Sequence, residues 1–541
     1  MISLYQFGTF DVSNYGDLLF PLLTRKRLEK IDANVIAVSP TNKKPIFKDH
    51  AIAKSIDDVE FRRPAAVLIG GGNIIHLAPT RLRDYYCDTS FISSYPDLWV
   101  GSSCLADLGI PVCWNAPGVP GPFSDEEVPI VRDCLKRSTY ISVRGHQSRE
   151  FLFRTYPEAV IEVVPDPAWE ISGLWTGDQL AKAYEDAFVR RHKKPPHRSI
   201  AVHLNSRYMT GSLVETIAQI LDKISISMDV TVILIGVGPC HGDDELARQA
   251  GFHMKTLPLI IDQPESLMEV AACIACSKAY AGSSMHGFIT ASAFGVPGIC
   301  VVNGTNIKFQ ELKAQFDDES ILADSWQTAA YRLPTIDTDI KRANLCKIKS
   351  KMLVQLDSHW NRILKVINQQ KNSFSSDEDI VSLNDNKNFL KYRVSLLVNN
   401  AAKYVRLHND VMAKLLDTRK TIAEKELVTA EKDQTIINAK AVIAEKELNS
   451  QKDRLAIARR DIEISRYRQE LYSVYTSRSW RYTAPLRRCD RIIRSLSCIM
   501  HTRGIRKVIK GAYFMLPQRI RQNSIVERLK TRFKRNETII Y

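Results

Sequence analysis

Residues 66–73 read AVLIGGGN, a short apolar run that ends in three consecutive glycines. Four apolar residues in a row suit a strand that is buried on both faces, as strands of parallel sheets are. Glycines that follow directly leave backbone N–H groups exposed and allow a ligand or a helix to approach closely. The same order of apolar run, turn and helical stretch repeats from residue 1 to about residue 310, which predicts parallel sheets with crossover helices.

Ten apolar runs in this region are expected to be strands. Six precede residue 175, and they are Ile2–Phe7, Val35–Val38, Ala66–Ile69, Val112–Asn115, Tyr140–Val143 and Glu162–Val164. Four follow residue 198, and they are Ser199–Leu204, Val230–Ile235, Ala279–Ala281 and Gly298–Val302. We therefore expect an α/β fold of two Rossmann-like domains that face each other across a cleft.

The boundaries of these domains come from changes in composition. Residues 176–198 are charged and end in KKPPHR, where Pro195 and Pro196 cannot continue a helix, so this stretch is expected to link a domain of residues 1–175 to one of residues 199–370. Residues 310–370 are expected to be helices that return to the core. The polar run 371–388 then predicts a second linker.

A helical extension is expected over residues 389–475. Residues 389–470 contain neither Gly nor Pro, and IAEKEL occurs at 422–427 and again at 443–448, an offset of three heptads. From Ile422 to Ile464, the residues at seven-residue spacing are mostly isoleucine. The residues three or four positions further on, which would complete the seam of a coiled coil, are mostly charged. A coiled coil that could join copies of the chain and a solvated single helix both remain open.

The charge of the chain is concentrated at its end. Of a net charge of +15, residues 476–541 contribute +14 through 17 Lys and Arg against three acids. A nearly neutral body argues against nucleic acid as a partner, and the tail alternates apolar patches with basic residues, which suits an anionic membrane surface. A disordered solubilising tail is the alternative. Without a basic segment before an apolar one at the start, or a long uncharged apolar stretch, we expect a cytoplasmic protein, peripheral at the inner face of the cell membrane.

Composition excludes two further classes of protein. The chain has 541 residues, 45% of them hydrophobic and 25% charged, which excludes wholesale disorder and collagen-like repeats. Its 11 cysteines are too few for a disulfide scaffold and are expected to be reduced.

The first candidate site residues follow the first expected strand. Asn14, Gly16 and Asp17 lie where that strand opens onto a helix, a turn that faces the cleft in a doubly wound sheet. Gly16 allows close approach of a ligand, and the amide and carboxylate lie near a helix N-terminus. A plain helix cap is the alternative interpretation.

Two more candidates end later strands. Gly70, Gly71 and Gly72, followed by Asn73, form a loop that could hold an anion, although glycines also serve close helix–strand packing. Arg144 ends the strand before residue 145, where its guanidinium could bind a carboxylate or phosphate or form a structural ion pair.

The second half carries one candidate cluster. Gly282-Ser283-Ser284-Met285-His286-Gly287 precedes a helix of small residues, which places His286 at a helix N-terminus. A structural histidine is the alternative. Asp166 stands between two prolines in an acidic turn that ends a strand; a role in the site and a turn fixed by the prolines both remain open. No spacing of Cys, His, Asp or Glu predicts a metal site.

Taken together and in this order, NYGD, the strand ending in GGG, SVR, DPA and the late GSxxHG before GVP resemble the polysaccharide pyruvyl transferase family over roughly residues 1–310. The resemblance implies a glycosyltransferase-B-like fold and transfer of the enolpyruvyl unit of phosphoenolpyruvate onto sugar hydroxyls of a glycan or lipid-linked glycan. Phosphoenolpyruvate is then the donor substrate, and no cofactor is expected. The resemblance implies that Arg144 contacts the donor, that His286 is the histidine of the catalytic site, and that Asn14, Gly16 and Asp17 line the cleft. Together with the chemistry of the reaction, this leads us to expect that the catalytic residues are His286, Asp17 and Arg144. The residues expected to bind the substrate are Asn14, Gly16, Gly70, Gly71, Gly72, Asn73, Arg207, Ser283 and Ser284.

The chain departs from the family pattern at two positions. Family members commonly carry an arginine where this chain has Ser284, and an acid where it has Gly145. Arg207 is a hypothetical replacement for the missing positive charge. A glycosyltransferase that uses a nucleotide sugar and a non-catalytic scaffold of polysaccharide assembly are the alternatives. Residues 477–487 resemble a segment that follows coiled coils in bacterial glycan-assembly glycosyltransferases.

Overall fold

The computed structural model describes residues 2–57, 59, 61–62, 64–77, 96–206, 214–302, 307–316, 318–371 and 380–381. All of them belong to one compact unit of the chain. The predictions for the helical extension 389–475, for the basic tail 476–541 and for Arg207 lie outside the described residues.

The first half is built on a parallel sheet of five strands in the order β3-β2-β1-β5-β6. The strands are β1 (Ile2–Phe7), β2 (Ala33–Ser39), β3 (Ala53–Ser55), β5 (Ala66–Ile69) and β6 (Val112–Trp114). Beside it lies a parallel pair, β7 (Ile141–Val143) and β8 (Ile161–Val163), connected to β6 by a bridge between Cys113 and Tyr140. Every residue of β5 and β6 is buried, as expected for strands covered on both faces.

Three helices of this half follow strands directly. They are α1 (Tyr15–Leu28), α3 (Val128–Arg137) and α4 (His146–Thr155). Helix α1 begins where the Asn14 side chain accepts a hydrogen bond from the N–H of Gly16, and it buries Leu18, Leu19 and Leu23. The cap places the first turn of α1 at the carboxyl end of the sheet.

The second half contains a parallel sheet of six strands in the order β11-β10-β9-β12-β13-β14. The strands are β9 (Ser199–His203), β10 (Thr231–Ile235), β11 (Leu259–Ile261), β12 (Ala279–Gly282), β13 (Gly298–Val301) and β14 (Leu322–Ala323). The helices before residue 300 are α5 (Gly177–Val189), α6 (Val214–Met228), α7 (Asp243–His253), α8 (Leu267–Ala275) and α9 (Met285–Ala293). Two parallel sheets with crossover helices confirm the expected α/β fold of two Rossmann-like halves.

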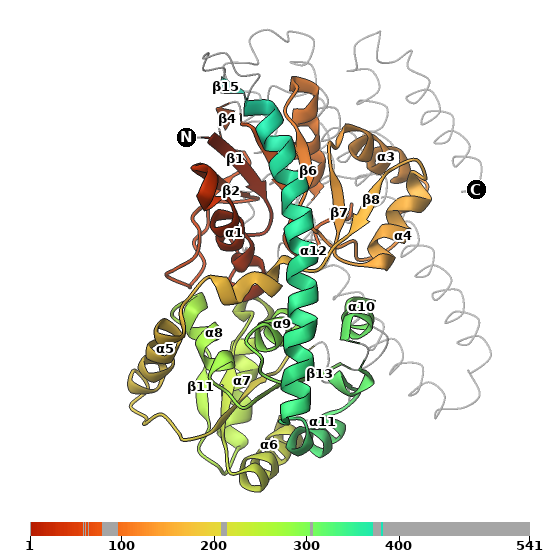
Figure 1. The fold of residues 1–541 in the computed structure, drawn as a ribbon. Helices are drawn as coiled ribbons and strands as arrows, with labels where there is room; N and C mark the ends of the chain where they lie inside the picture. The colour runs from red at the N-terminus through yellow and green to blue at the C-terminus, as the bar shows by residue number, and fades with distance from the viewer. Residues whose placement is uncertain are drawn as a thin grey trace, which may run out of the picture. The chain divides into compact units, whose positions relative to one another are not determined.

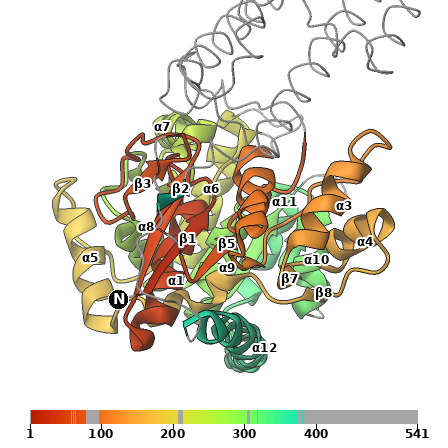
Figure 2. The ribbon, with the colours of Figure 1, turned by 90° about the horizontal axis from the view of Figure 1, so that it is seen from above.

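The chain returns from the second half to the first along one long helix. After α10 (Ile307–Phe316) and α11 (Trp326–Arg332), helix α12 (Asp339–Lys371) runs beside both halves (Figure 1) and is seen nearly end-on in Figure 2. It contacts α9, β5 and the 3₁₀ helix η4 (Pro167–Gly173). Trp360 and Ile363 of α12 are fully buried, so the helix is part of the core.

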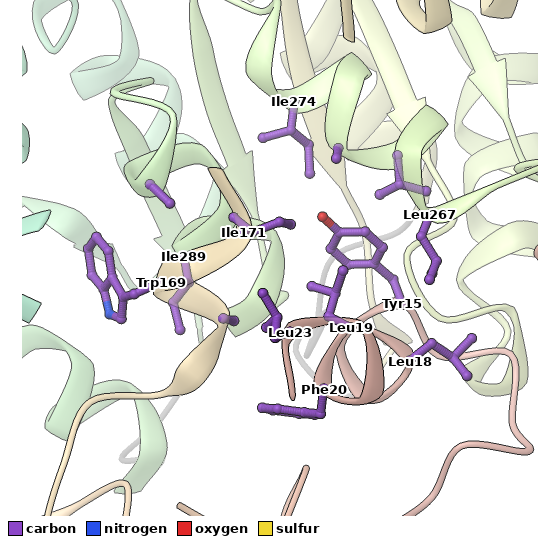
Figure 3. Close-up of a cluster of buried hydrophobic side chains, with 14 of the residues drawn as sticks. Tyr15, Leu18, Leu19, Phe20, Leu23, Trp169, Ile171, Leu267, Ile274 and Ile289 are labelled. Atoms are coloured by element: carbon purple, nitrogen blue, oxygen red, sulfur yellow. The ribbon is translucent and has the colours of Figure 1, made fainter. Parts of the chain in front are cut away.

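One buried apolar cluster spans both halves. In it, Leu18, Leu19 and Leu23 of α1 pack with Leu267 and Ile274 of α8, and with side chains from η4 and α9 (Figure 3). Burial of apolar surface is the main force that holds α1 against the second half.

All ten expected strands are present, with ends that differ by at most two residues. Sequence analysis missed three short strands of the two main sheets, β3, β11 and β14, because two or three residues carry too little periodicity to detect. Helix α5 occupies Gly177–Val189, inside the segment 176–198 that was expected to be a linker. Ile380–Val381, inside the expected linker 371–388, form β15, which pairs with β4 (Phe61–Arg62). Among the helices of the described residues, none combines the length and apolar character that a membrane span requires.

Candidate active site

The site lies where the strand order of each sheet reverses. In the first sheet, β2 and β3 lie on one side of β1, and β5 and β6 lie on its other side. In the second sheet, β10 and β11 lie on one side of β9, and β12, β13 and β14 lie on its other side. Loops after such strands diverge and leave a crevice at the carboxyl ends, where ligands bind in α/β proteins. The turn before α1, the glycine loop after β5 and the turn before α9 all leave these strands.

The glycine loop has a backbone that favours glycine. Gly71 and Gly72 have φ angles of +112° and +70°, which other residues rarely adopt. A β-carbon on Gly72 would lie 2.7 Å from Asp17 Oδ1, so the loop and the first turn of α1 are in contact. The N–H of Gly70 donates to the carbonyl of Phe7 at 3.1 Å, which takes this amide out of the anion cradle that the three glycines were expected to form.

The glycine loop is supported from behind by α12. The carbonyl of Asn115 packs against Gly70, where a β-carbon would lie 2.3 Å away. His359 of α12 places Nε2 2.9 Å from Asn115 Oδ1 and Nδ1 2.9 Å from the hydroxyl of Tyr140. Burial lowers the pKa of His359 to about 3, so the ring stays neutral as a structural bridge.

Arg144 extends from the end of β7 to two partners. Its Nη1 donates to Asp166 Oδ2 at 2.9 Å, and its Nη2 donates to Asn73 Oδ1 at 2.5 Å. Arg144 and Asp166 are 8% and 4% exposed, so this is a buried ion pair. Gly118 leaves room for the Asn73 amide that Arg144 binds, because a β-carbon on Gly118 would lie 2.0 Å from Asn73 Oδ1.

His286, at the start of α9, joins the same carboxylate from the second half. Its Nε2 lies 3.4 Å from Asp166 Oδ2. Its other ring nitrogen faces α1, where a β-carbon on Gly16 would lie 1.8 Å from Nδ1. The Phe20 ring packs nearly perpendicular to the imidazole, with 5.6 Å between the ring centroids. These three contacts to the ring of His286 all come from the first half, from α1 and from the turn after β8.

The two carboxylates of this cluster have opposite pKa shifts. Burial raises the pKa of Asp17, and the charges of His286 and Arg144 and a hydrogen bond from Thr9 only partly offset it. Burial also disfavours the ionised form of Asp166, but the charges of His286 and Arg144 outweigh it and hold the pKa of Asp166 below its ordinary value. Divergent environments of this kind separate a proton-exchanging carboxyl from a permanent carboxylate. We define the site cluster as Asp17, Asn73, Arg144, Asp166 and His286.

A family model described as polysaccharide pyruvyl transferase matches residues 14–305. The chain belongs to the polysaccharide pyruvyl transferase family. The family is one of transferases that act on polysaccharides, and the expected resemblance is confirmed over the part of the chain that contains the site cluster.

Solved structures are similar to this pyruvyl transferase family member at low sequence identity. A putative UDP-N-acetylglucosamine 2-epimerase from Listeria monocytogenes has a TM-score of 0.42 and 12% identity, over 66% of this chain and 96% of that chain. A UDP-GlcNAc 2-epimerase from Methanocaldococcus jannaschii has a TM-score of 0.42 and 12% identity, over 63% and 93%. A glycosyltransferase from Rickettsia africae has a TM-score of 0.41 and 12% identity, over 68% and 98%. No curated protein matches the chain.

The first departure from the pyruvyl transferase pattern is compensated in space. At Gly145 a β-carbon would lie 1.9 Å from Glu311 Oε2, so the carboxylate of Glu311 from α10 occupies the space beside that glycine. Glu311 Oε1 also accepts the N–H of Gln147 at 2.7 Å and so caps α4, whose N-cap residue, Gly145, makes no side-chain cap hydrogen bond. Sequence analysis missed Glu311 because it lies far along the chain, in the other half.

At the second departure, the two serines before His286 have structural roles. Ser284 caps α9 by accepting the N–H of Gly287 at 3.1 Å, and Ser283 donates to the carbonyl of Val301 at 2.7 Å. Both hydroxyls thus have structural partners. Asn14 caps α1 and places Nδ2 3.4 Å from His241 Nε2.

Asp166 is the site residue that sequence analysis missed. The signal was an acid in a rigid turn directly after a strand, but two prolines beside it explained the turn equally well. Within the described residues, no group of three or more His, Cys, Asp or Glu could hold a metal ion. A cleft of about 540 Å³ lies at the far end of α1, near Arg25 and Trp175, and the site cluster does not line it.

Proposed function

We propose that this protein transfers the enolpyruvyl unit of phosphoenolpyruvate to a sugar of a surface polysaccharide or its precursor and forms a pyruvate ketal. The methylene carbon of the donor takes up a proton, and a sugar hydroxyl adds to the resulting oxocarbenium-like carbon and loses its own proton. A second hydroxyl then displaces phosphate and closes the ketal. The reaction requires an acid, a base and positive charge beside an anionic donor.

One observation supports this proposal above the others: Arg144 and His286, from different halves, converge on the single carboxylate of Asp166. Arg144 supplies a guanidinium fork for a carboxylate or phosphate of the donor. His286 is proposed as the acid and Asp17 as the base. The raised pKa of Asp17 lies closer to neutral pH, where a general base is most effective. Asp166 orients the other two groups.

Donor-specific assays test the proposal. Purified full-length protein is incubated with phosphoenolpyruvate and a lipid-linked glycan, and release of inorganic phosphate and glycan-bound pyruvate is measured. His286→Ala is expected to lower the rate by about 100-fold or more, the usual contribution of a positioned acid. The matched control is His253→Ala, an exposed histidine of α7 outside the site cluster.

Other outcomes favour the alternatives. Release of a nucleoside diphosphate from a nucleotide sugar, without phosphate release from phosphoenolpyruvate, would support glycosyl transfer on the same scaffold. The absence of arginine at Ser284 motivates the scaffold alternative. If His286→Ala left the glycan unchanged in cells while deletion of 389–541 abolished its assembly, that alternative would replace the enzymatic one.

The sequence beyond the described residues supports a second proposal, on location. We propose that residues 476–541 bind an anionic membrane surface at the cytoplasmic face and that residues 389–475 join copies of the chain. Truncation at about residue 475 is expected to abolish salt-sensitive sedimentation with anionic vesicles, since attraction amounts to about 1 kcal/mol per basic residue near such a surface. Undiminished sedimentation of the truncated protein would refute the membrane proposal.

A further inference from the structure

Tyr15 connects the two halves of the molecule through both its backbone and its side chain. Its N–H donates to the carbonyl of Val237 in the second half at 2.9 Å. Its hydroxyl shares a hydrogen bond of 3.0 Å with the hydroxyl of Thr290 in α9. Both Tyr15 and Thr290 are completely buried. Figure 3 shows the ring of Tyr15 among apolar side chains of the cluster between α1 and α8.

The neighbours of this hydrogen bond are residues of the site. Gly16, which follows Tyr15, packs against the imidazole of His286. Thr290 is one helical turn after His286, so the two share a face of α9. The bond between Tyr15 and Thr290 therefore lies one turn away from the contact between Gly16 and His286.

Apolar packing alone does not set this contact to within an ångström. The apolar side chains that surround Tyr15 favour burial but impose no direction, whereas a buried hydrogen bond between two hydroxyls requires a narrow range of distance. A shift of about 1 Å in a catalytic group can cost about 100-fold in rate. A directional bond one turn from His286 is well placed to prevent such a shift.

We propose that Tyr15 is a positioning residue, whose hydrogen bond to Thr290 sets the register in which α9 presents His286 to Asp166. Arg144 directly follows β7 and Asp166 lies in the turn after β8, and among the described residues neither shares a hydrogen bond or ion pair with Tyr15. Loss of the bond is therefore expected to affect the turnover step that uses His286 and to leave donor binding at Arg144 nearly unchanged. This consequence for turnover rests on the proposed function.

Two isosteric variants test the proposal. Tyr15→Phe and Thr290→Val each remove one hydroxyl and keep the buried shape, and each leaves the other hydroxyl without its partner. The double variant removes both, which is close to neutral for stability in such cases. We expect kcat to fall by about tenfold or more in the double variant, with KM for phosphoenolpyruvate within about twofold of the wild type and a melting temperature near it. A double variant that regains wild-type kcat together with wild-type stability would show a merely structural role and overturn the proposal.

A second measurement does not depend on the reaction. The rate at which diethyl pyrocarbonate acylates His286 can be followed by peptide mass spectrometry, with the exposed His253 as internal control. We expect His286 to react several-fold faster in the double variant, because its ring is no longer held between Gly16 and Asp166. An unchanged rate would overturn the proposal. If the wild-type protein releases no phosphate from phosphoenolpyruvate, the proposed function fails, and this measurement still decides whether Tyr15 positions His286.

Discussion

Gly16→Ala is the substitution with the most specific expected effect. A β-carbon at this position would lie 1.8 Å from His286 Nδ1, 2.5 Å from Cγ and 2.7 Å from Cε1. Ordinary contact begins at 3.4 Å, so the imidazole or the start of α1 must move by about 1.6 Å. The ring has little freedom to do so, because Phe20 and Asp166 hold its other sides.

The size of the effect follows from this displacement. Misplacement of a catalytic group by about 1 Å can cost 100-fold, so the rate of phosphate release is expected to fall by about 100-fold or more. Overpacking costs about 1–3 kcal/mol of stability, and replacing glycine by alanine in a helix returns up to about 1 kcal/mol. The variant is thus expected to remain folded, with a melting temperature lower by only a few degrees.

A matched glycine provides the control. Gly177, the first residue of α5, has no atom within 4 Å of the position that a β-carbon would take. Gly177→Ala is expected to leave both the melting temperature and the rate nearly unchanged. If Gly16→Ala retained more than half of the wild-type rate, the contact between α1 and His286 would not matter for turnover.

Three further substitutions test the charges of the site cluster. Arg144→Lys is expected to lower kcat/KM for the donor by about tenfold or more, because an ammonium cannot replace a guanidinium that binds Asp166 and Asn73 in two directions; unchanged kinetics would contradict this role. Asp166→Asn is expected to cost about 3 kcal/mol at neutral pH, since it leaves a buried Arg144 unpaired. Because the pKa of Asp166 is lowered in the folded protein, its ionised carboxylate contributes to the free energy of unfolding above about pH 4. This contribution is lost as the pH falls through the folded-state pKa, so the acid unfolding of Asp166→Asn should depend less on pH than that of the wild type. Because the pKa of Asp17 is raised, ionisation of its buried carboxyl destabilises the folded protein as the pH rises. Asp17→Asn should therefore raise the melting temperature at pH 7, while the rate of phosphate release falls.

The strands were predictable from local sequence pattern. Each of the ten expected strands is an apolar run that must be buried, and burial of a strand on both faces is visible in four or five consecutive residues. Helix α1 was equally accessible, since Asn14 carries the side chain that helix N-termini prefer. Helix α5 was missed because its charged residues suggested a linker. Its start nevertheless carries a local signal, the capping box of Thr176 and Gln179, and the helix packs against α8.

The site cluster was only partly accessible from sequence. Arg144, His286 and Asp17 were identified because each follows a strand or begins a helix at the edge where ligands bind. Asp166 and Glu311 were not, because their importance comes from partners in distant parts of the chain. A carboxylate in a turn has the same local sequence whether it faces water or a buried guanidinium.

The sequence by itself determined the two Rossmann-like halves, the loops at their carboxyl ends and the family, because strand burial, helix caps and glycine turns act over a few residues. Only the tertiary structure decided that Asp166 binds both Arg144 and His286, that Gly16 faces the imidazole and that Glu311 lies beside Gly145. The contacts of His286 and Glu311 join residues of different halves, and they depend on how α1, α9 and α10 pack across the interface. The pair of Arg144 and Asp166 joins the ends of two neighbouring strands within the first half. Apolar burial brings the halves together without imposing a direction. The distances at which polar groups of the two halves meet are therefore set by the packed structure and cannot be predicted from a few neighbouring residues.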